Sequence, residues 1–332
     1  MGTFFRRFCI FSLILLVGCS GSQAPKEKFQ SDGLPILRGV TLSPKSFSSE
    51  DFSIFLTYAQ EAGTALAWSG DWAELAIEKE DGPEVTMGLS KKYGLTPVII
   101  AQFFTQSSGT LLRPLTDESK KRYLEDAIAF ARKYQPPYLA LGIEINTLYE
   151  KDPPAFEAFV QFFPMAYDSV KAASPSTKVF TVFQLERMKG LHGGLFGGTN
   201  DESKAEWFLL EKFMNADIIG FTTYPGLIYR YPSEIPSDYY SEIAKHAKKP
   251  VVFTEIGWHS AAKPKGWESS EEEQALFVQF FFNHIDDLRP LFAIWSFLYD
   301  QKIQEPFDSA GLIQNDGGGK EAWNAWKKSY PP

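Results

Sequence analysis

Residues 138–149 read YLALGIEINTLY. The stretch begins as a short apolar run of the kind that forms a buried strand, yet a glutamate, Glu144, follows near its end, with an asparagine two places later. A carboxylate buried without a partner costs free energy, so either Glu144 lies at an opening in the fold or the run is not a buried strand. On a strand, side-chain alternation would place Gly142, Glu144 and Asn146 on one side.

Similar apolar runs recur along the chain, rich in Val, Ile, Phe and Thr, and several follow Pro or Gly, as buried parallel strands do. We expect strands at 36–42, 64–68, 97–103, 138–145, 178–183, 217–223, 250–255 and 292–297. Longer segments with helical spacing lie between them, among them 116–134, 269–288 and 320–328. Thr116 opens a capping pattern, TDES, and Ser270 precedes a glutamate-rich first turn that suits the helix dipole.

Eight strands, each followed by a helical segment, predict a single (β/α)8 TIM barrel over residues 34–332. The alternative is a doubly wound open sheet, which usually carries a glycine-rich phosphate loop after its first strand. GVTLSPKS (39–46) offers no such loop, and HGGLFGG (192–198) has the wrong spacing and follows the fifth strand. The barrel is therefore the preferred fold.

Composition describes a globular protein with a large core, because 44% of the 332 residues are hydrophobic and 22% are charged. The net charge is −8 and no basic stretch exceeds short pairs, so nucleic acid is not an expected partner. The chain has 8 Trp, 14 Tyr and 29 Phe. This abundance favours a pocket in which a ligand stacks its apolar faces on aromatic rings.

The N-terminus has the pattern of an export signal. Arg6 and Arg7 precede an apolar run, 9–17, that is too short to span a bilayer. The junction Leu16-Val17-Gly18-Cys19 resembles the lipobox of bacterial lipoproteins. That resemblance implies a signal peptide at 1–18, a lipidated Cys19 and a flexible tether at 19–33, rich in polar residues. An ordinary secretory signal that happens to contain Cys19 is the alternative.

Lipidation would anchor the exported chain at the bacterial cell envelope, in the outer or the cytoplasmic membrane. The chain has two cysteines, and Cys9 lies inside the expected signal peptide, so the mature form would keep one and have no disulfide.

A second glutamate repeats the first pattern. PVVFTEIGWHS (250–260) places Glu255 at the end of the expected seventh strand. Active sites of (β/α)8 barrels lie at the carboxyl ends of the strands, so Glu144 and Glu255 are expected to face each other across the barrel mouth. Glycoside hydrolases typically use two carboxyl groups that face each other across the bond to be cleaved. A single glutamate is more often a rim ion-pair partner, but the two matching positions favour catalysis.

Four stretches carry a family resemblance, GIEIN (142–146), DIIGFTTYP (217–225), VVFTEIGWHS (251–260) and IWSFLYD (294–300), and the tail GLIQNDGGGKEAW (311–323) adds to it. The chain resembles the retaining (β/α)8 glycoside hydrolases that hold an acid/base glutamate after strand four and a nucleophile after strand seven. DIIGFTTYP is similar to the endo-β-galactanases of that superfamily, and FTEIG to a group of its β-mannanases.

The resemblance implies that Glu144 is the acid/base, Glu255 the nucleophile, Tyr224 a hydrogen-bond donor to the nucleophile, and Trp295 the platform beneath the sugar. Many of these enzymes carry an asparagine directly before the acid/base, where it binds the sugar 2-hydroxyl. Here that position is Ile143. The sequence offers Asn146, Gln102 and Gln184 as substitutes and does not choose among them.

Other aromatic and imidazole side chains follow expected strands. Trp68 follows the second strand, and Trp258 and His259 follow the seventh, so we expect them to contribute to substrate binding. The four histidines form no HxH or HExxH arrangement, and no G-x-S-x-G motif occurs, so neither a metal nor a cofactor is expected.

The sequence thus predicts an envelope-anchored monomer that hydrolyses a β-linked polysaccharide or oligosaccharide with retention. The alternative is a non-catalytic glycan-binding lipoprotein on a degenerate barrel, which the Ile143 departure keeps open. A structural envelope protein without a sugar ligand is a third reading.

Overall fold

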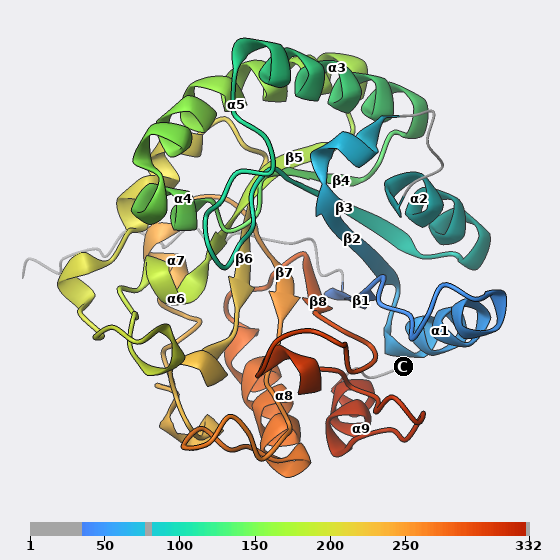
Figure 1. Cartoon of the computed structure of the whole chain (residues 1–332), viewed down its shortest axis with the longest axis vertical. Coiled ribbons are helices and arrows are strands. Elements are labelled where there is room, and N and C mark those ends of the chain that lie inside the picture. Colours follow the sequence, from blue (N-terminus) through green and yellow to red (C-terminus); the bar gives the residue numbers. More distant parts are fainter. Residues whose placement is uncertain (1–34, 77–81, 330–332) are drawn as a thin grey trace, which may run out of the picture. The chain divides into compact units, whose positions relative to one another are not determined.

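The computed structural model describes residues 35–76 and 82–329. Eight parallel strands follow one another around a closed barrel, and the last pairs with the first (Figure 1). They are β1 (Leu37–Thr41), β2 (Ala65–Asp71), β3 (Thr96–Gln102), β4 (Tyr138–Leu141), β5 (Lys178–Gln184), β6 (Ile218–Thr223), β7 (Val251–Ile256) and β8 (Phe292–Trp295). The predicted (β/α)8 TIM barrel is confirmed.

Aromatic side chains fill the barrel at the amino ends of its strands. Tyr138 at the start of β4 meets Phe292 at the start of β8 with ring centroids 4.9 Å apart, and Phe180 of β5 packs on Phe292 at 6.4 Å. Strands β4 and β8 lie on opposite sides of the ring, so these rings meet across its interior. The interior is a packed core at this end, as is usual for the fold, and space for a ligand is left at the other.

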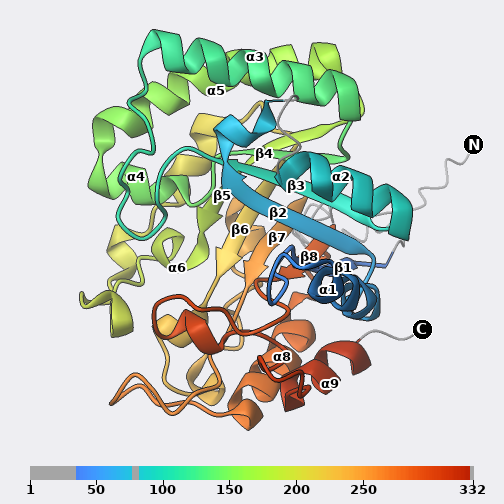
Figure 2. The same ribbon diagram turned by 45° about the vertical axis from the view of Figure 1, so that its right-hand side comes forward.

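Helices surround the strands, and α3 and α5 lie side by side over one part of the barrel, as α8 and α9 do over another (Figures 1 and 2). The α-helices are α1 (Ser49–Ala62), α2 (Gly82–Tyr93), α3 (Asp117–Tyr134), α4 (Ile145–Lys151), α5 (Pro153–Ala173), α6 (Leu185–Met188), α7 (Ile243–His246), α8 (Glu271–Ile285) and α9 (Glu321–Lys328). The predicted caps are present: the hydroxyl of Thr116 accepts from Ser119 N–H, and that of Ser270 from Glu273 N–H, each at 3.2 Å.

The helical layer is thinner than predicted after β5 and β6, where α6 and α7 have only four residues each. Glycines at 193, 194, 197 and 198 interrupt the first segment, and prolines at 225, 232 and 236 the second, because neither residue suits a helix interior. Most of the 3-10 helices among the described residues lie in these two segments, and the full set is η1 (Trp72–Leu75), η2 (Gly194–Phe196), η3 (Glu202–Lys204), η4 (Trp207–Phe213), η5 (Pro225–Leu227), η6 (Pro232–Glu234) and η7 (Phe307–Ser309).

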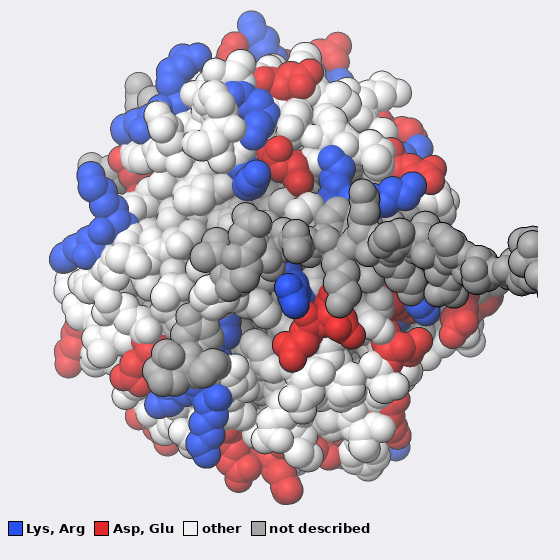
Figure 3. All heavy atoms as spheres, turned by 180° about the vertical axis from the view of Figure 1, so that it is seen from behind, with Lys and Arg blue, Asp and Glu red and all other residues white. Residues whose placement is uncertain are grey.

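Acidic and basic side chains are interspersed over the described part of the face opposite that of Figure 1, without one broad area of either sign (Figure 3). Among the described residues, none of the helices has the length and apolar character that a membrane span requires. The expected signal peptide, the tether and Cys19 lie outside the residues that the structure describes.

Candidate active site

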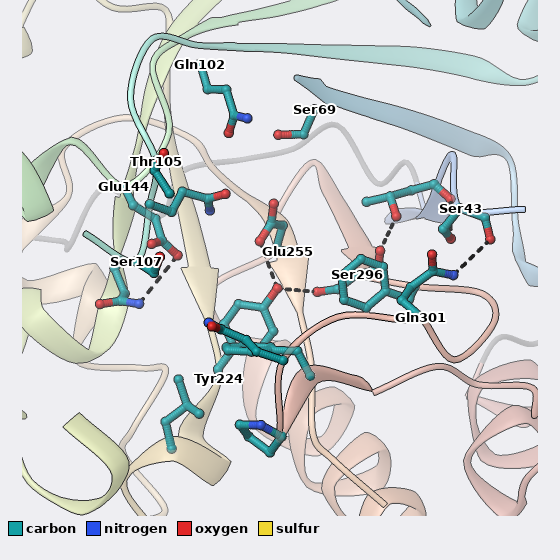
Figure 4. A pocket seen from close by; sticks show the side chains of 18 of the residues that line it. Ser43, Ser69, Gln102, Thr105, Ser107, Glu144, Tyr224, Glu255, Ser296 and Gln301 are labelled. Carbon is teal, nitrogen blue, oxygen red and sulfur yellow. Dashed lines mark hydrogen bonds between the residues drawn. The ribbon is translucent and has the colours of Figure 1, made fainter. Parts of the chain in front are cut away.

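A cavity of about 1230 Å³ opens at the carboxyl ends of the strands. Its lining comes from the ends of the barrel strands and the loops after them, as the close view in Figure 4 shows for part of the set. Representative residues, from β1 to β8, are Thr41, Ser43, Trp68, Ser69, Gln102, Glu144, Gln184, Tyr224, Glu255 and Ser296. Both predicted glutamates therefore line one cavity.

Glu144 reaches the cavity because the backbone turns sharply after β4. The strand ends at Leu141, and the left-handed residues Gly142 (φ 96°) and Glu144 (φ 51°) flank Ile143 before α4 begins at Ile145. Ile143 and Ile145 are fully buried, whereas the carboxylate of Glu144 lines the cavity. The glutamate thus lies at an opening in the fold, but on a turn rather than on the longer strand that the sequence suggested.

Two side chains from neighbouring strands contact the Glu144 carboxylate. The hydroxyl of Thr222 on β6 donates to Oε1 at 2.7 Å, and the amide nitrogen of Gln184 on β5 lies 3.5 Å from the same oxygen. Burial first, and then the negative charge of Glu255, raise the pKa of Glu144 to about 8, while the Thr222 hydrogen bond acts in the opposite direction. At neutral pH this carboxyl group is mainly protonated.

Glu255 lies near the end of β7 and receives hydrogen bonds that favour its charged form. The hydroxyl of Tyr224 donates to its Oε2 at 2.8 Å, and Gln106 also hydrogen-bonds to it. Burial raises the pKa of Glu255 above its usual range, and both hydrogen bonds oppose that rise. The Tyr224 hydroxyl also lies 2.6 Å from the Ser296 hydroxyl (Figure 4).

A buried glutamate outside the cavity lining holds Tyr224 in place. Glu186 accepts hydrogen bonds from the Tyr224 backbone N–H at 2.9 Å, from Thr223 Oγ1 at 3.1 Å and from the Tyr239 hydroxyl at 2.8 Å. Burial raises the pKa of Glu186, and these donors oppose the rise. Glu186 thereby holds the start of the loop after β6, and the Tyr224 hydroxyl is directed at Glu255.

Two of the aromatic residues predicted to bind substrate, Trp68 and Tyr224, line the cavity. Trp68 and Gln102 line it, and Tyr224 both lines it and makes the expected hydrogen bond to Glu255. Gln184, one of the three offered substitutes for the missing asparagine, lines it as well. The view in Figure 4 places Glu144 and Glu255 around the same open space.

Trp295 and Trp258, predicted to bind substrate, belong to the core instead. Trp295 is fully buried, donates to the Ala310 carbonyl at 2.8 Å and packs on Trp326 at 5.7 Å. Trp258 is 1% exposed and stacks on Phe277 at 5.2 Å. Alternation explains the first error, since the next residue, Ser296, is the one that lines the cavity.

His259 and Asn146 are likewise absent from the cavity lining. His259 is 4% exposed, and its Nε2 lies 2.9 Å from the carbonyl oxygen of Trp267. Asn146 is fully buried in the first turn of α4 and pairs with the backbone of Gln184, accepting from its N–H at 2.9 Å and donating to its carbonyl at 3.1 Å. Asn146 therefore has a structural contact where a substrate contact was expected.

Sequence reasoning missed Thr222, Gln106 and Ser296, which contact the two glutamates or Tyr224. Alternation on β6 was a usable signal for one of them, because Thr222 precedes Tyr224 by two positions and faces the same side. Gln106 lies in the loop after β3, where no periodic pattern indicates direction.

One group of side chains has the composition of a metal site. Ligand atoms of Glu150, His192 and Glu206 lie within 4.8 Å of one another. His192 Nε2 is 2.6 Å from Glu150, and the Arg187 guanidinium forms an ion pair with the same carboxylate. Burial and then the charge of Glu150 raise the pKa of Glu206 to about 8. The Arg187 guanidinium thus already pairs with the Glu150 carboxylate, and the raised pKa of Glu206 disfavours a second negative charge beside it.

No family model matches the sequence, and no curated protein matches it either. Solved structures share the fold. A family 39 glycoside hydrolase from Bacteroides cellulosilyticus WH2 has a TM-score of 0.58 at 18% identity over 89% of this chain, which spans 63% of the length of that protein. Xylanase 10B from Thermotoga maritima has a TM-score of 0.63 at 13% identity, with 89% of this chain and 94% of the xylanase covered.

GH5_18 from Streptomyces cattleya, solved as a variant in complex with Manβ1-4GlcNAc, has a TM-score of 0.64 at 15% identity, covering 89% of this chain and 80% of that one. At identities this low, the TM-scores show a common (β/α)8 fold and nothing more. The predicted (β/α)8 fold is therefore also the fold of these solved structures.

Proposed function

We propose that this chain is a retaining glycoside hydrolase that cleaves a β-linked polysaccharide or oligosaccharide. One observation carries the proposal: Glu144 with a pKa of about 8 and Glu255 hydrogen-bonded by Tyr224 line the same open cavity. A carboxyl group that keeps its proton beside a second carboxylate that accepts a hydrogen bond suits acid-assisted displacement. For a retaining enzyme we expect the carboxyl groups to be about 5 Å apart.

Each carboxyl group has a defined role in the proposed reaction. The Glu255 carboxylate attacks the anomeric carbon while protonated Glu144 transfers its proton to the departing glycosidic oxygen, which leaves a glycosyl ester on Glu255. Glu144, now ionised, then takes a proton from a water molecule that attacks the same carbon. The ester bond breaks, Glu255 is released as a carboxylate, and the sugar leaves with its original anomeric configuration.

The electrostatics support this exchange of roles. The charge of Glu255 is one cause of the raised pKa of Glu144. When Glu255 becomes an uncharged ester, that contribution disappears and the pKa of Glu144 falls. Glu144 therefore holds its proton in the first half of the cycle, when an acid is needed, and stays ionised more readily in the second, when it must act as a base.

The proposed substrate is supported by the lining and by the structural neighbours. Polar side chains such as Gln102, Gln184 and Ser69 share the cavity lining with Trp68 and Phe307, a combination that suits a hydroxylated ring with apolar faces. The neighbours include a xylanase, an exo-β-1,4-mannosidase and a protein in complex with Manβ1-4GlcNAc.

The location is part of the proposal. The motif that ends at Cys19 supports export, cleavage and lipidation, which would hold the barrel at the bacterial cell envelope through a tether of about 15 residues, 19–33.

A hydrolysis panel tests the activity. We would assay the soluble barrel on mannan, galactan, xylan and β-glucan and on aryl β-glycosides, with the anomer of the first product read by NMR. Glu255→Gln is expected to lower kcat/KM by more than about 1,000-fold on every substrate cleaved, with the fold intact. Glu268→Gln, an exposed glutamate outside the cavity, is the matched control.

Glu144→Ala separates the acid from the nucleophile. This variant should lose far more activity on substrates with poor leaving groups than on activated aryl glycosides, which need little protonation, and added azide should restore turnover. Equal losses on both substrate types without azide rescue would exclude Glu144 as the acid. Tight glycan binding without hydrolysis in the parent would favour the glycan-binding alternative.

A further inference from the structure

Gln184 presents an amide nitrogen beside the proposed acid. It is the last residue of β5, is 6% exposed and lines the cavity. Its Nε2 lies 3.5 Å from Oε1 of Glu144. That oxygen already accepts from Thr222 at 2.7 Å, and 3.5 Å is near the outer limit of a hydrogen bond. The amide thus keeps donor capacity at the cavity surface.

The orientation of this amide is set by its oxygen. Arg187 Nε donates to Gln184 Oε1 at 2.7 Å, so the oxygen faces the guanidinium and the nitrogen faces Glu144. A flipped amide would place N–H groups against N–H groups and lose this bond. Arg187 is in turn held by its ion pair with Glu150.

The backbone of Gln184 is held as firmly as its side chain. The Asn146 amide pairs with both its N–H, at 2.9 Å, and its carbonyl, at 3.1 Å, and also donates to Glu206 at 3.1 Å. Side chains of α4 and α6 therefore hold the backbone and the amide of this one residue. A donor that is fixed before substrate arrives loses little entropy on binding.

We propose that Gln184 Nε2 donates a hydrogen bond to the 2-hydroxyl of the sugar whose anomeric carbon Glu255 attacks. The inference rests on the proposed function. The glycosidic oxygen must lie at Glu144, and the 2-hydroxyl is borne by the carbon next to the one being attacked. Ile143 is buried in the core and cannot reach the cavity, Asn146 is engaged with backbone, and Gln106 is engaged with Glu255.

This contact is expected to act mainly in the transition state, because hydrogen bonds to the 2-hydroxyl strengthen as the oxocarbenium character of the ring develops. Gln184 is therefore expected to determine which configurations at carbon 2 are accepted. Losing it should lower kcat more than it raises KM.

The test compares paired substrates. The aryl β-glycoside that the wild type cleaves fastest is assayed beside its 2-deoxy counterpart, with Gln184→Met removing the donor at similar length. We expect kcat/KM to fall roughly 30-fold on the hydroxylated substrate and less than about threefold on the 2-deoxy substrate. Equal losses on the two substrates would overturn the inference.

Gln102→Met is the matched control, because it makes the same change elsewhere in the same cavity lining. It should change both substrates by the same factor and leave their ratio intact; a ratio that moves as it does in Gln184→Met would overturn the assignment to Gln184. Thermal unfolding checks that Gln184→Met is folded. Gln184→Leu is the second variant, and it is expected to give the same ratio.

Labelling separates this inference from the function on which it rests. An activated 2-deoxy-2-fluoro β-glycoside, which forms the glycosyl ester but hydrolyses slowly, should add one sugar mass to Glu255 in the wild type. A wild type that is neither labelled nor active overturns the proposed function and, with it, the inference. A labelled wild type whose Gln184→Met variant loses both substrates equally overturns the inference alone.

Discussion

The two glutamates have the same side chain, yet their surroundings differ. Glu144 lies between two buried isoleucines and receives one short hydrogen bond, from Thr222. Glu255 receives hydrogen bonds from Tyr224 and Gln106. Burial raises both pKa values; the charge of Glu255 adds to the rise at Glu144, where Thr222 opposes it, and Tyr224 and Gln106 oppose the rise at Glu255. The difference in role is thus a property of neighbouring residues.

Thr222→Val tests this account at the level of one hydrogen bond. The Thr222 hydroxyl stabilises the charged form of Glu144, so its removal should raise the pKa of that carboxyl further above about 8. The alkaline limb of kcat/KM, which reports the proton of the acid, should move to higher pH by about one pH unit.

Thr254→Val is the control, because Thr254 is an equally buried threonine whose hydroxyl bonds to the Phe221 carbonyl at 3.3 Å. Its alkaline limb should stay where the wild type has it. A limb in Thr222→Val that moves to lower pH, or does not move, would contradict the assignment of that limb to Glu144.

At the scale of elements, the turn between β4 and α4 organises this side of the site. Its two left-handed residues direct Glu144 into the cavity and place Asn146 in the first turn of α4, against the end of β5. One turn and the short helix after it therefore supply both the proposed acid and the clamp on Gln184. This turn explains why Asn146, two residues after Glu144, contacts the backbone of Gln184 on β5 instead of the cavity.

Asn146→Ala should destabilise the folded protein. It would leave the buried N–H and carbonyl of Gln184 without their partners, and unsatisfied buried groups cost about 1–3 kcal/mol each. We expect the free energy of unfolding in urea to fall by about 2–4 kcal/mol.

Asn200→Ala provides the comparison. Asn200 also accepts from a backbone N–H, that of Gly193 at 2.8 Å, but it is exposed, so its loss should cost less than about 1 kcal/mol. Similar losses in the two variants would show that the paired contacts of Asn146 add nothing.

For the whole molecule, barrel closure determines where chemistry can occur. Rings such as Tyr138 and Phe292 meet across the interior at one end, and the cavity lies at the other, among the loops after the strands. Glu144 and Glu255, 111 positions apart in the sequence, are brought to one opening because β4 and β7 both run toward it.

Anchoring is a prediction for the whole chain. Cys19→Ala should leave the protein unprocessed or in a soluble fraction, whereas the wild type should partition with membranes and enter detergent. Fractionation followed by mass spectrometry of the N-terminus provides the measurement. A mature, processed Cys19→Ala chain that remains in the membrane fraction would show that lipidation at this position is not the anchor.

The sequence pattern alone was enough to predict the barrel and to place the two glutamates at strand ends. Each strand is a local pattern of buried residues, and even the ends of most predicted strands agree with the structure to within one or two residues, as at 178–183 against β5. In this fold the carboxyl ends of all strands lie at the barrel mouth, so a carboxylate at 144 or 255 could be placed there without knowledge of any contact. Where glycines or prolines interrupt the connecting segments, the rule of one helix after each strand failed.

Which neighbours of those glutamates face the cavity could not be predicted from the sequence and depends on the folded arrangement. Trp295 and Ser296 are adjacent in sequence, yet one is core and the other lines the cavity, and Asn146 leaves the strand pattern because two left-handed residues precede it. Likewise, the raised pKa of Glu144 depends on Glu255 and Thr222, which lie on other strands. The direction of a side chain and the pKa of a carboxyl group depend on atoms that come into contact only after folding. The sequence pattern does not contain the distances between those atoms.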